Sequence, residues 1–314
     1  MQTQSKILIL SGPTATGKTD FAIKLAKLFD LTIINFDSLC FYKELLIGSA
    51  RPTDEELIGT QHYLIGTESI FALLNAADFW RKASAIIQSL SKENKNILLV
   101  GGSGFYLNTL LHGMFESTTT PKLIQEKSDI VYQENGIEAF LSILKEVDPK
   151  NFERLHPNDH YRIRRAVEHY WTTNTPFSQA KDNLVKESGI INQFAALHLY
   201  FDIPKSEHRE IILNRVNQMI HKGFQAEVAN LLKNYPKLKE NKALNSIGYK
   251  EMQQYLRGEI SSLENCIEKI AIATHQLAKH QRTWFQKIVD KKVFNPLTDE
   301  SQILIEIERF ISNS

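Results

Sequence analysis

Short hydrophobic runs alternate with longer amphipathic segments along the first hundred residues of the chain. Largely apolar runs occupy residues 6–10, 31–35, 62–65 and 97–100, and each has the length of a single strand. Between them, residues 16–29 and 75–90 place apolar side chains at helical spacing. Apolar strands that alternate with helices are typical of a parallel sheet covered by helices. The pattern therefore predicts an α/β fold.

The pattern changes after about residue 115. Residues 116–194 contain helical segments and polar turns without a convincing central strand. A strand-like run returns at 195–201, and an amphipathic helix is expected over 204–222, with Gly223 as its C-terminal stop. We therefore expect a core formed by residues 1–115 and 195–314, interrupted by an all-helical insertion over 116–194.

Composition narrows the class of protein further. Lys and Arg number 37 against 36 Asp and Glu, so a nucleic-acid site must be local rather than a property of the whole surface. No apolar run approaches the roughly 20 residues of a membrane helix. The N-terminus lacks the regions of a secretory signal, and Cys40 and Cys266 form no CxxC pair or disulfide framework. These features predict a cytoplasmic protein without a membrane span.

The segment SGPTATGKT at residues 11–19 follows a predicted strand and opens a predicted helix. It matches the phosphate-loop spacing G-x-x-x-x-G-K-[ST], in which backbone N–H groups, a helix N-terminus and a lysine surround a polyphosphate and a hydroxyl binds Mg²⁺. We expect the core to be P-loop NTPase-like. We expect Thr19 to contact the metal, directly or indirectly, and the diphosphate or nucleotide to be bound by Gly12, Pro13, Thr14, Ala15, Thr16, Gly17, Lys18 and Thr19.

The carboxylates that follow the predicted strands indicate whether the phosphate loop serves nucleotide hydrolysis or another reaction. The strand at 97–100 ends in Gly101 and Gly102 without the acid that nucleotide hydrolases usually place there. Asp202 follows the later strand, but beside Pro204 it is expected to stabilise a helix start. Asp37 follows the strand at 31–35, at the sheet edge where α/β proteins bind ligands, so it is a candidate general base. The alternative is that Asp37 and Ser38 only cap the following segment.

Seven sequence blocks in order resemble the tRNA dimethylallyltransferases, also called tRNA isopentenyltransferases or the IPP transferase family. The resemblance runs nearly end to end. The blocks are GPTATGKT at 12–19, DSLCFY at 37–42 with IGSARP at 47–52, GGSGFY at 101–106, HPNDHYRIRRAVE at 156–168, RVNQMIHKGFQAEV at 215–228, SIGYKE at 246–251 and QRTWF at 281–285.

The resemblance implies transfer of the dimethylallyl group of dimethylallyl diphosphate to N6 of the adenosine 3′ to the anticodon, with release of diphosphate and a requirement for Mg²⁺. It implies that Asp37 is the base, that Thr19 binds diphosphate or Mg²⁺, and that Arg215 contacts the diphosphate. Such chemistry needs no hydrolase acid, because the phosphate loop stabilises a leaving group.

The target base must be flipped out of the anticodon loop to reach a buried allylic carbon. By resemblance, the residues expected to contact tRNA are Asp37, Ser38, Leu39, Cys40, Ser103, Tyr161, Arg162, Ile163, Arg164, Arg165, Lys279 and Arg282. The basic residues of 275–292 surround Trp284 and Phe285, which we interpret as buried anchors. Phe105 and Tyr106 are likewise expected in the core rather than stacked on RNA.

The chain departs from the family pattern at a few positions. Gln61 replaces one histidine of a pair, Arg51 replaces the lysine of TAKP, Ser103 replaces threonine and His280 replaces the arginine of KRQ. None of these lies in the phosphate loop or at Asp37, so the departures bear on RNA choice. His62 is expected to be structural, and the histidines show no zinc-binding spacing.

Three other functions remain as alternatives. A small-molecule or nucleotide kinase would use the same loop with Asp37 as base. A non-catalytic tRNA-binding module would not need an intact phosphate loop. A prenyltransferase acting on free adenylate would share the chemistry but would not need the arginine-rich segment at 154–169. We expect a monomer that binds tRNA and dimethylallyl diphosphate.

Overall fold

The computed structural model describes residues 5–72, 74–114, 120–179, 189–236 and 241–312. The chain forms two compact units, the first made of Met1–Leu111 with Gly189–Ser314 and the second of His112–Ser188. Sequence analysis placed residues 190–194 in the insertion, which is wrong. They belong to the first unit because the 3₁₀ helix η1 (Ile190–Gln193) buries Ile190 and Ile191 against the sheet.

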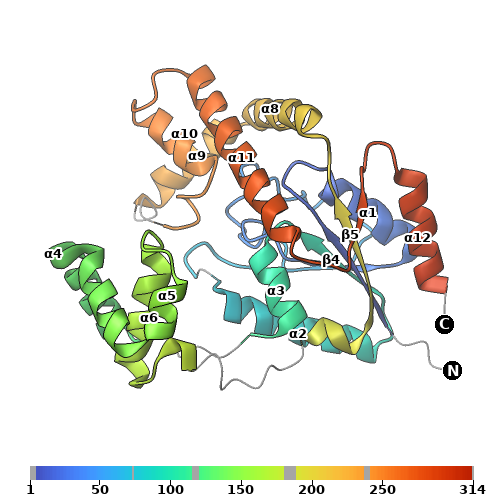
Figure 1. Ribbon diagram of the computed structural model, residues 1–314. Helices are drawn as coiled ribbons and strands as arrows, with labels where there is room; N and C mark the ends of the chain where they lie inside the picture. Colours follow the sequence, from blue (N-terminus) through green and yellow to red (C-terminus); the bar gives the residue numbers. More distant parts are fainter. Residues whose placement is uncertain (1–4, 73, 115–119, 180–188, 237–240, 313–314) are drawn as a thin grey trace. The chain divides into compact units, whose positions relative to one another are not determined.

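A six-stranded, entirely parallel sheet forms the centre of the first unit (Figure 1). Its order is β3-β2-β4-β1-β5-β6. The strands are β1 (Lys6–Ser11), β2 (Thr32–Asn35), β3 (His62–Tyr63), β4 (Ile97–Gly101), β5 (Ala195–Phe201) and β6 (Lys292–Phe294). Five of these were predicted. The edge strand β6 was not, because its three residues are largely exposed and form no apolar run.

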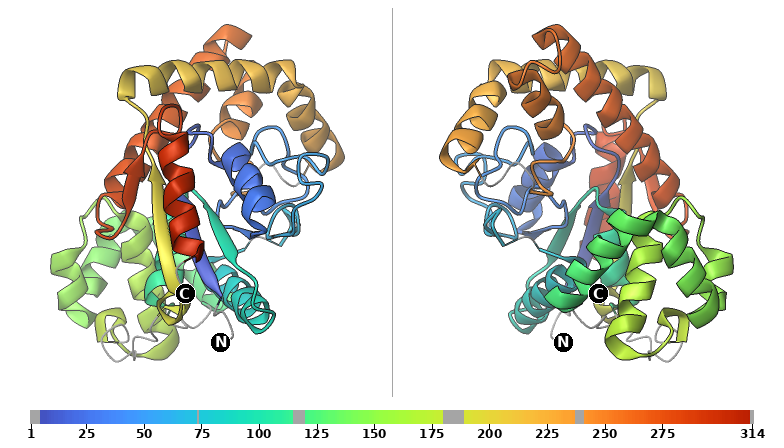
Figure 2. Two further views of the ribbon diagram at one scale, coloured as in Figure 1. Left: turned by 90° about the vertical axis from the view of Figure 1, so that its right-hand side faces the viewer. Right: turned by 90° about the vertical axis from the view of Figure 1, so that its left-hand side faces the viewer.

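Helices cover both faces of this sheet (Figure 2). Along β1, Leu8 and Leu10 face α1 (Lys18–Phe29) and α12 (Glu300–Ser312). Ile7 and Ile9 face α2 (Ala76–Lys92) and α3 (Gly104–His112) on the other side. Because successive strand residues point to opposite faces, both sets must be apolar, which explains the unbroken hydrophobic run in the sequence.

A cluster of four helices completes the first unit. These are α8 (Lys205–His221), α9 (Phe224–Asn234), α10 (Tyr249–Leu256) and α11 (Leu263–Phe285). Their shared core includes Phe224 and Tyr249, whose rings meet edge to face at 5.1 Å between centroids. A Cβ at Gly48 would lie 2.2 Å from the Phe224 ring, so glycine is required where this loop meets the helices.

The second unit is helical, as the sequence predicted. It contains α4 (Lys122–Val147), α5 (Pro149–Arg154) and α6 (His160–Thr173) around Phe140, Leu144 and Val167. Gly136 interrupts α4 with a left-handed φ of 67°, which glycine adopts without steric cost.

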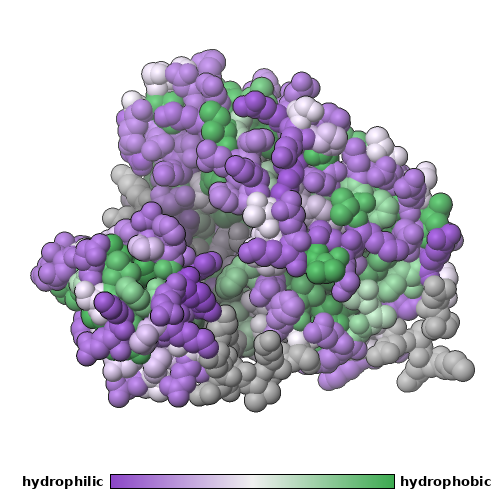
Figure 3. Space-filling model, viewed as in Figure 1, coloured by the Kyte–Doolittle hydropathy of each residue, from purple (hydrophilic) through white to green (hydrophobic). Residues whose placement is uncertain are grey.

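The surface carries hydrophobic residues in separate patches among hydrophilic ones on the face shown in Figure 3. Isolated patches of this kind are normal for a folded protein in water. Within the described residues, no helix is both long and apolar enough to cross a membrane.

Candidate active site

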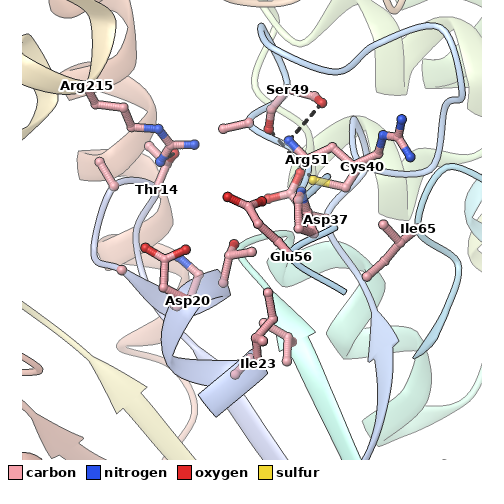
Figure 4. Close-up of a pocket in the computed structure, with 18 of the residues that line it drawn as sticks. Thr14, Asp20, Ile23, Asp37, Cys40, Ser49, Arg51, Glu56, Ile65 and Arg215 are labelled. Atoms are coloured by element: carbon pink, nitrogen blue, oxygen red, sulfur yellow. Dashed lines mark hydrogen bonds between the residues drawn. The ribbon is translucent and has the colours of Figure 1, made fainter. Parts of the chain in front are cut away.

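The carboxyl ends of β1, β2 and β4 open onto one cavity of about 680 Å³ in the first unit. Its wall includes the loop from Thr14 to Thr19, Asp37 after β2, Gly101 at the end of β4 and Arg215 from α8. Ligands of open α/β sheets bind at this edge. In Figure 4, Arg215 and Thr14 lie on one side of the cavity and Asp37 and Cys40 lie on the other.

The phosphate loop has a conformation that its glycines permit. Gly12 has φ 153°, and a Cβ there would lie 2.4 Å from the Phe201 carbonyl oxygen. Gly17 has φ 76° and immediately precedes α1. The Thr16 hydroxyl donates to the Pro13 carbonyl over 2.9 Å, closing the turn. The loop therefore directs the N-terminus of α1 toward the cavity, where the helix dipole favours an anion.

Lys18 is buried at the base of this loop, with 8% of its surface exposed. Its ammonium group donates to the Pro13 carbonyl over 2.5 Å. Burial is the main cause that lowers the Lys18 pKa to about 7, with Arg215 lowering it further and Asp37 raising it. Because a bound polyanion would stabilise the charged ammonium, this lysine is suited to bind phosphate.

Arg215 approaches the loop from α8. Its Nη1 donates to the Thr14 hydroxyl over 3.4 Å. Among the described residues it forms no ion pair with a carboxylate, so its charge is available to a ligand. The structure thus brings Lys18, Thr19 and Arg215 to one cavity, as the sequence predicted.

Asp37 is held by its backbone rather than by its carboxylate. Its N–H donates to Asn35 Oδ1 over 2.9 Å, and Asn35 Nδ2 donates to the Asp37 carbonyl over 3.0 Å. Among the described residues, the carboxylate accepts one bond, a long one of 3.4 Å from the Leu39 N–H. No helix begins at this point within the described residues, and the bond from the Leu39 N–H is the weak capping contact of the following turn. The carboxylate is positioned to accept a proton in the cavity.

The neighbours of Asp37 differ in how they face the cavity. Cys40 lines the cavity, and its thiol donates to the Ser49 carbonyl over 3.7 Å. Burial raises the pKa of this thiol, and the negative charge of Asp37 raises it further. Leu39 is half-buried and packs against the core of the helix cluster, and its RNA contact stays a prediction. Ser38 is half-buried.

Glu227 on α9 is a residue that sequence reasoning missed. Its carboxylate accepts the N–H groups of residues 46, 47 and 48 and the Tyr249 hydroxyl, at 2.7 Å from Ile47 N and 2.6 Å from the hydroxyl oxygen. These bonds fix the loop that carries Arg51 into the cavity wall. The block GFQAEV was noticed in the sequence, but nothing local to it indicates this partner 180 residues away.

Arg282 does not lie where an RNA contact requires. It is 9% exposed, its Nε donates to Asp202 over 2.7 Å, and its Nη2 donates to the Ile203 carbonyl. The prediction for Arg282 is therefore wrong. Asp202 has a structural role, as expected, but through its ion pair with Arg282 rather than as a helix cap, because Pro204 is the N-cap of α8. Lys279, one turn earlier on α11, is exposed.

The predicted RNA contacts of the second unit divide into exposed and internal residues. Tyr161 is 70% exposed, and the Arg162 side chain is 71% exposed. Ile163 is fully buried in the core of this unit, so its predicted RNA contact is wrong. Arg164 pairs with Asp129 and lies over the Tyr132 ring, and Arg165 pairs with Glu168.

The two aromatic residues of GGSGFY, Phe105 and Tyr106, differ in how far they are buried. Phe105 is 58% exposed, so the core interpretation is wrong for it. The Tyr106 ring lies 4.7 Å from that of Phe79, and burial raises its pKa to about 12. Trp284 packs so closely that a Cβ at Gly104 would lie 2.2 Å from its indole. Trp284 is partly buried beside the fully buried Phe285, as expected, and Ser103 is half-buried before α3.

Residues with oxygen donors line the cavity, namely Thr19, Asp20, Asp37 and Glu56. Among the described residues, no group of three or more His, Cys, Asp or Glu side chains forms a metal site. Thr19, the last residue of the phosphate loop, lines the cavity. Mg²⁺ usually takes one or two protein ligands and completes its shell with phosphate oxygens and water, which fits this arrangement.

Comparison with known proteins identifies the family. The family model described as IPP transferase matches residues 40–288. A tRNA dimethylallyltransferase 2 of Geotalea daltonii is 37% identical over 91% of this chain and 87% of its own. A tRNA dimethylallyltransferase of Thermoanaerobacter sp. is also 37% identical, over 90% of this chain and 89% of its own.

Two solved structures are similar along nearly the whole chain. The full-length tRNA isopentenylpyrophosphate transferase of Bacillus halodurans has a TM-score of 0.70 and 27% identity, covering 98% of this chain and 96% of its own. A eukaryotic dimethylallyltransferase acting on tRNA has a TM-score of 0.84 and 26% identity, covering 98% of this chain and 80% of its own. With a P-loop core, a family match over most of the length and these relatives, the chain belongs to the IPP transferase family.

Proposed function

We propose that the protein transfers the dimethylallyl group of dimethylallyl diphosphate to N6 of the adenosine 3′ to the anticodon of tRNA. The observation that carries the proposal is a single cavity that is lined by both the phosphate loop and Asp37, whose carboxylate accepts one long bond, from the Leu39 N–H. The relatives named as tRNA dimethylallyltransferases and the structure of a related enzyme acting on tRNA support this substrate class.

In the proposed reaction, the bond between the allylic carbon and the diphosphate oxygen breaks and a bond to adenine N6 forms. The electron pair leaves with the diphosphate, and the N6 proton passes to Asp37. Lys18, Arg215 and the loop N–H groups would stabilise the charge that builds on the leaving group. Holding both substrates in one cavity would align the carbon with the amine.

We propose that Mg²⁺ binds the diphosphate with Thr19 as its protein contact. When bound, the ion would neutralise part of the charge on the leaving oxygens. The chain itself would contribute the hydroxyl of Thr19, which lines the cavity.

The tRNA contacts that we propose are the accessible members of the predicted set. In the first unit these are Asp37, Ser38, Leu39, Ser103 and Lys279, whereas Cys40 lines the cavity but is buried. In the second unit, Tyr161 and Arg162 are the most exposed, and Arg164 and Arg165 retain partly exposed guanidinium groups. Exposed arginines would contact phosphates and an exposed tyrosine would stack on a base. We place the enzyme in the cytoplasm with its tRNA, as a monomer.

A kinase is the second candidate, because it would use the same loop and base. Two features disfavour it. β4 ends in Gly101 without an acid, and the acid after β5, Asp202, is paired with Arg282. Among the described residues, neither β4 nor β5 therefore supplies the cavity with the acid that commonly holds the metal of a nucleoside triphosphate.

A dual-label experiment tests the proposal. The protein is incubated with an adenosine-containing anticodon stem-loop, adenosine monophosphate as a competing acceptor, and either dimethylallyl diphosphate labelled in its carbon chain or ATP labelled in its γ-phosphate. We expect label in RNA only from the prenyl donor. Label in RNA only from ATP would refute the assignment, and label in adenosine monophosphate but not in RNA would show a free-adenylate prenyltransferase.

A further inference from the structure

The peptide of Thr14, in the middle of the phosphate loop, is held by side chains from distant parts of the first unit. Its N–H donates to Gln281 Oε1 over 2.8 Å, and its carbonyl oxygen lies 2.8 Å from His208 Nε2. Its hydroxyl receives the bond from Arg215 already described. Thr14 is thereby held through its N–H, its carbonyl oxygen and its hydroxyl.

The partners of His208 determine its tautomer. A carbonyl oxygen only accepts, so Nε2 must carry the proton that it donates to Thr14. Nδ1 lies 2.7 Å from Nη2 of Arg282, which only donates, so Nδ1 must be unprotonated. His208 is fully buried, and burial is the main cause that lowers its pKa, which favours this neutral form.

Arg282 is itself fixed by two further bonds. Its Nε donates to Asp202 at 2.7 Å and its Nη2 to the Ile203 carbonyl at 3.1 Å. Asp202, Arg282 and His208 therefore form a continuous chain of hydrogen bonds from the end of β5 to the phosphate loop.

Gln281 supports Thr14 from the opposite side. Its Nε2 donates to the Gly102 carbonyl over 2.9 Å while its Oε1 accepts the Thr14 N–H. It thus bridges the loops that follow β1 and β4. A Cβ at Gly102 would lie 2.6 Å from this amide nitrogen, so glycine leaves the room that the bridge needs.

The phosphate loop contains a residue in an unfavourable backbone conformation, which its surroundings must stabilise. Ala15, the next residue, is buried and has φ 62°, a left-handed conformation that is unfavourable for a residue with a Cβ. Such conformations persist where the surroundings fix them, and they occur at sites that bind ligands in a preset geometry. The bonds to both sides of the Thr14 peptide provide that restraint.

We propose that His208, oriented by Arg282 and Asp202, acts with Gln281 as a pair of positioning residues that hold the Thr14 peptide in the geometry that receives the diphosphate. Neither residue touches the reacting atoms. The inference rests on the proposed function, since it requires that the loop binds the diphosphate of the prenyl donor.

A matched pair of substitutions at His208 tests this role. In His208→Gln, the amide nitrogen reaches the position of Nε2 and keeps the donor to Thr14. In His208→Asn, the side-chain oxygen takes the position of Nδ1 and keeps the acceptor for Arg282, but the donor to Thr14 is lost. The readout is the Kd of inorganic diphosphate with Mg²⁺, measured by titration calorimetry. Loss of one hydrogen bond predicts a Kd raised about tenfold in His208→Asn, with His208→Gln within about threefold of wild type.

Gln281→Leu is the second variant, because it removes the acceptor of the Thr14 N–H at a half-buried position where folding is less at risk. It should also raise the Kd of diphosphate about tenfold. Circular dichroism and the melting temperature of the free protein show that each variant is folded.

Three outcomes distinguish a positioning role of these residues from a merely structural role, and from failure of the proposed function. A Kd raised in His208→Asn and Gln281→Leu but restored in His208→Gln supports the proposal. Equal affinities in all folded variants and wild type overturn it, leaving the network with a structural role and the proposed function intact. Failure of the wild-type protein to bind diphosphate overturns the proposed function and this inference with it.

Discussion

Replacing Asp37 by asparagine removes the proposed base while preserving the size of the side chain. The backbone bonds between residues 35 and 37 do not involve the carboxylate, so the loop should keep its position. General-base catalysis typically contributes about 10² to 10⁴ in rate. Asp37→Asn should therefore raise the barrier of the chemical step by about 3 to 5 kcal/mol.

The assay must separate chemistry from donor binding. Asp37 raises the pKa of Lys18, so its loss also weakens the charge of the lysine that binds diphosphate. A single turnover of a labelled stem-loop at saturating dimethylallyl diphosphate measures the chemical step alone. Under these conditions the rate should fall about 10² to 10⁴-fold while tRNA affinity changes less.

Asp30→Asn is the matched control, because Asp30 is exposed at the C-cap of α1 and its left-handed φ of 50° suits asparagine. It should leave the rate unchanged. If Asp37→Asn retained at least a third of the wild-type single-turnover rate, Asp37 would not be the base.

Three further predictions follow from the structure. Diphosphate binding should weaken as the pH rises above about 7, because the charged form of Lys18 binds the anion and the Lys18 pKa is about 7 in the free protein. Calorimetry in buffers of different ionisation enthalpy should show that protons are taken up on binding. A diphosphate affinity that does not change with pH would contradict the assignment, as would an equally steep pH dependence in Lys18→Arg. Ile163→Ala should lower the free energy of unfolding of the second unit by about 2 to 5 kcal/mol in urea titrations, whereas Arg162→Ala should leave stability unchanged and weaken stem-loop binding. Glu227→Ala should lower the free energy of unfolding by about 1 to 3 kcal/mol, because it leaves the N–H groups of residues 46–48 without their acceptor. An unchanged urea midpoint would contradict this and show that water replaces the carboxylate as their acceptor.

The core of the site was predictable because its signals are local. The phosphate loop is one contiguous motif, and Asp37 directly follows an apolar strand, so both were located by short-range pattern and by the rule for sheet edges. The parallel sheet was predictable for the same reason, except for β6, whose three residues carry no pattern of their own.

The errors concern which face of a helix is buried. Arg282 and Ile163 lie in segments rich in charge, and the sequence did not reveal that each points inward. The missed residues depend on distant partners: Gln281 meets Thr14 across 267 positions and His208 meets it across 194. Such contacts arise only when β1, α8 and α11 pack together, so no local signal specifies them.

The central claim is that the phosphate loop holds the leaving group of a prenyl donor whose carbon chain faces Asp37. A crystal structure with an unreactive thio analogue of dimethylallyl diphosphate tests it most directly. We expect the diphosphate against Lys18 and the N-terminus of α1, with the allylic carbon in the cavity on the side of Asp37. A diphosphate bound outside the loop, or a carbon chain directed away from Asp37, would contradict the account.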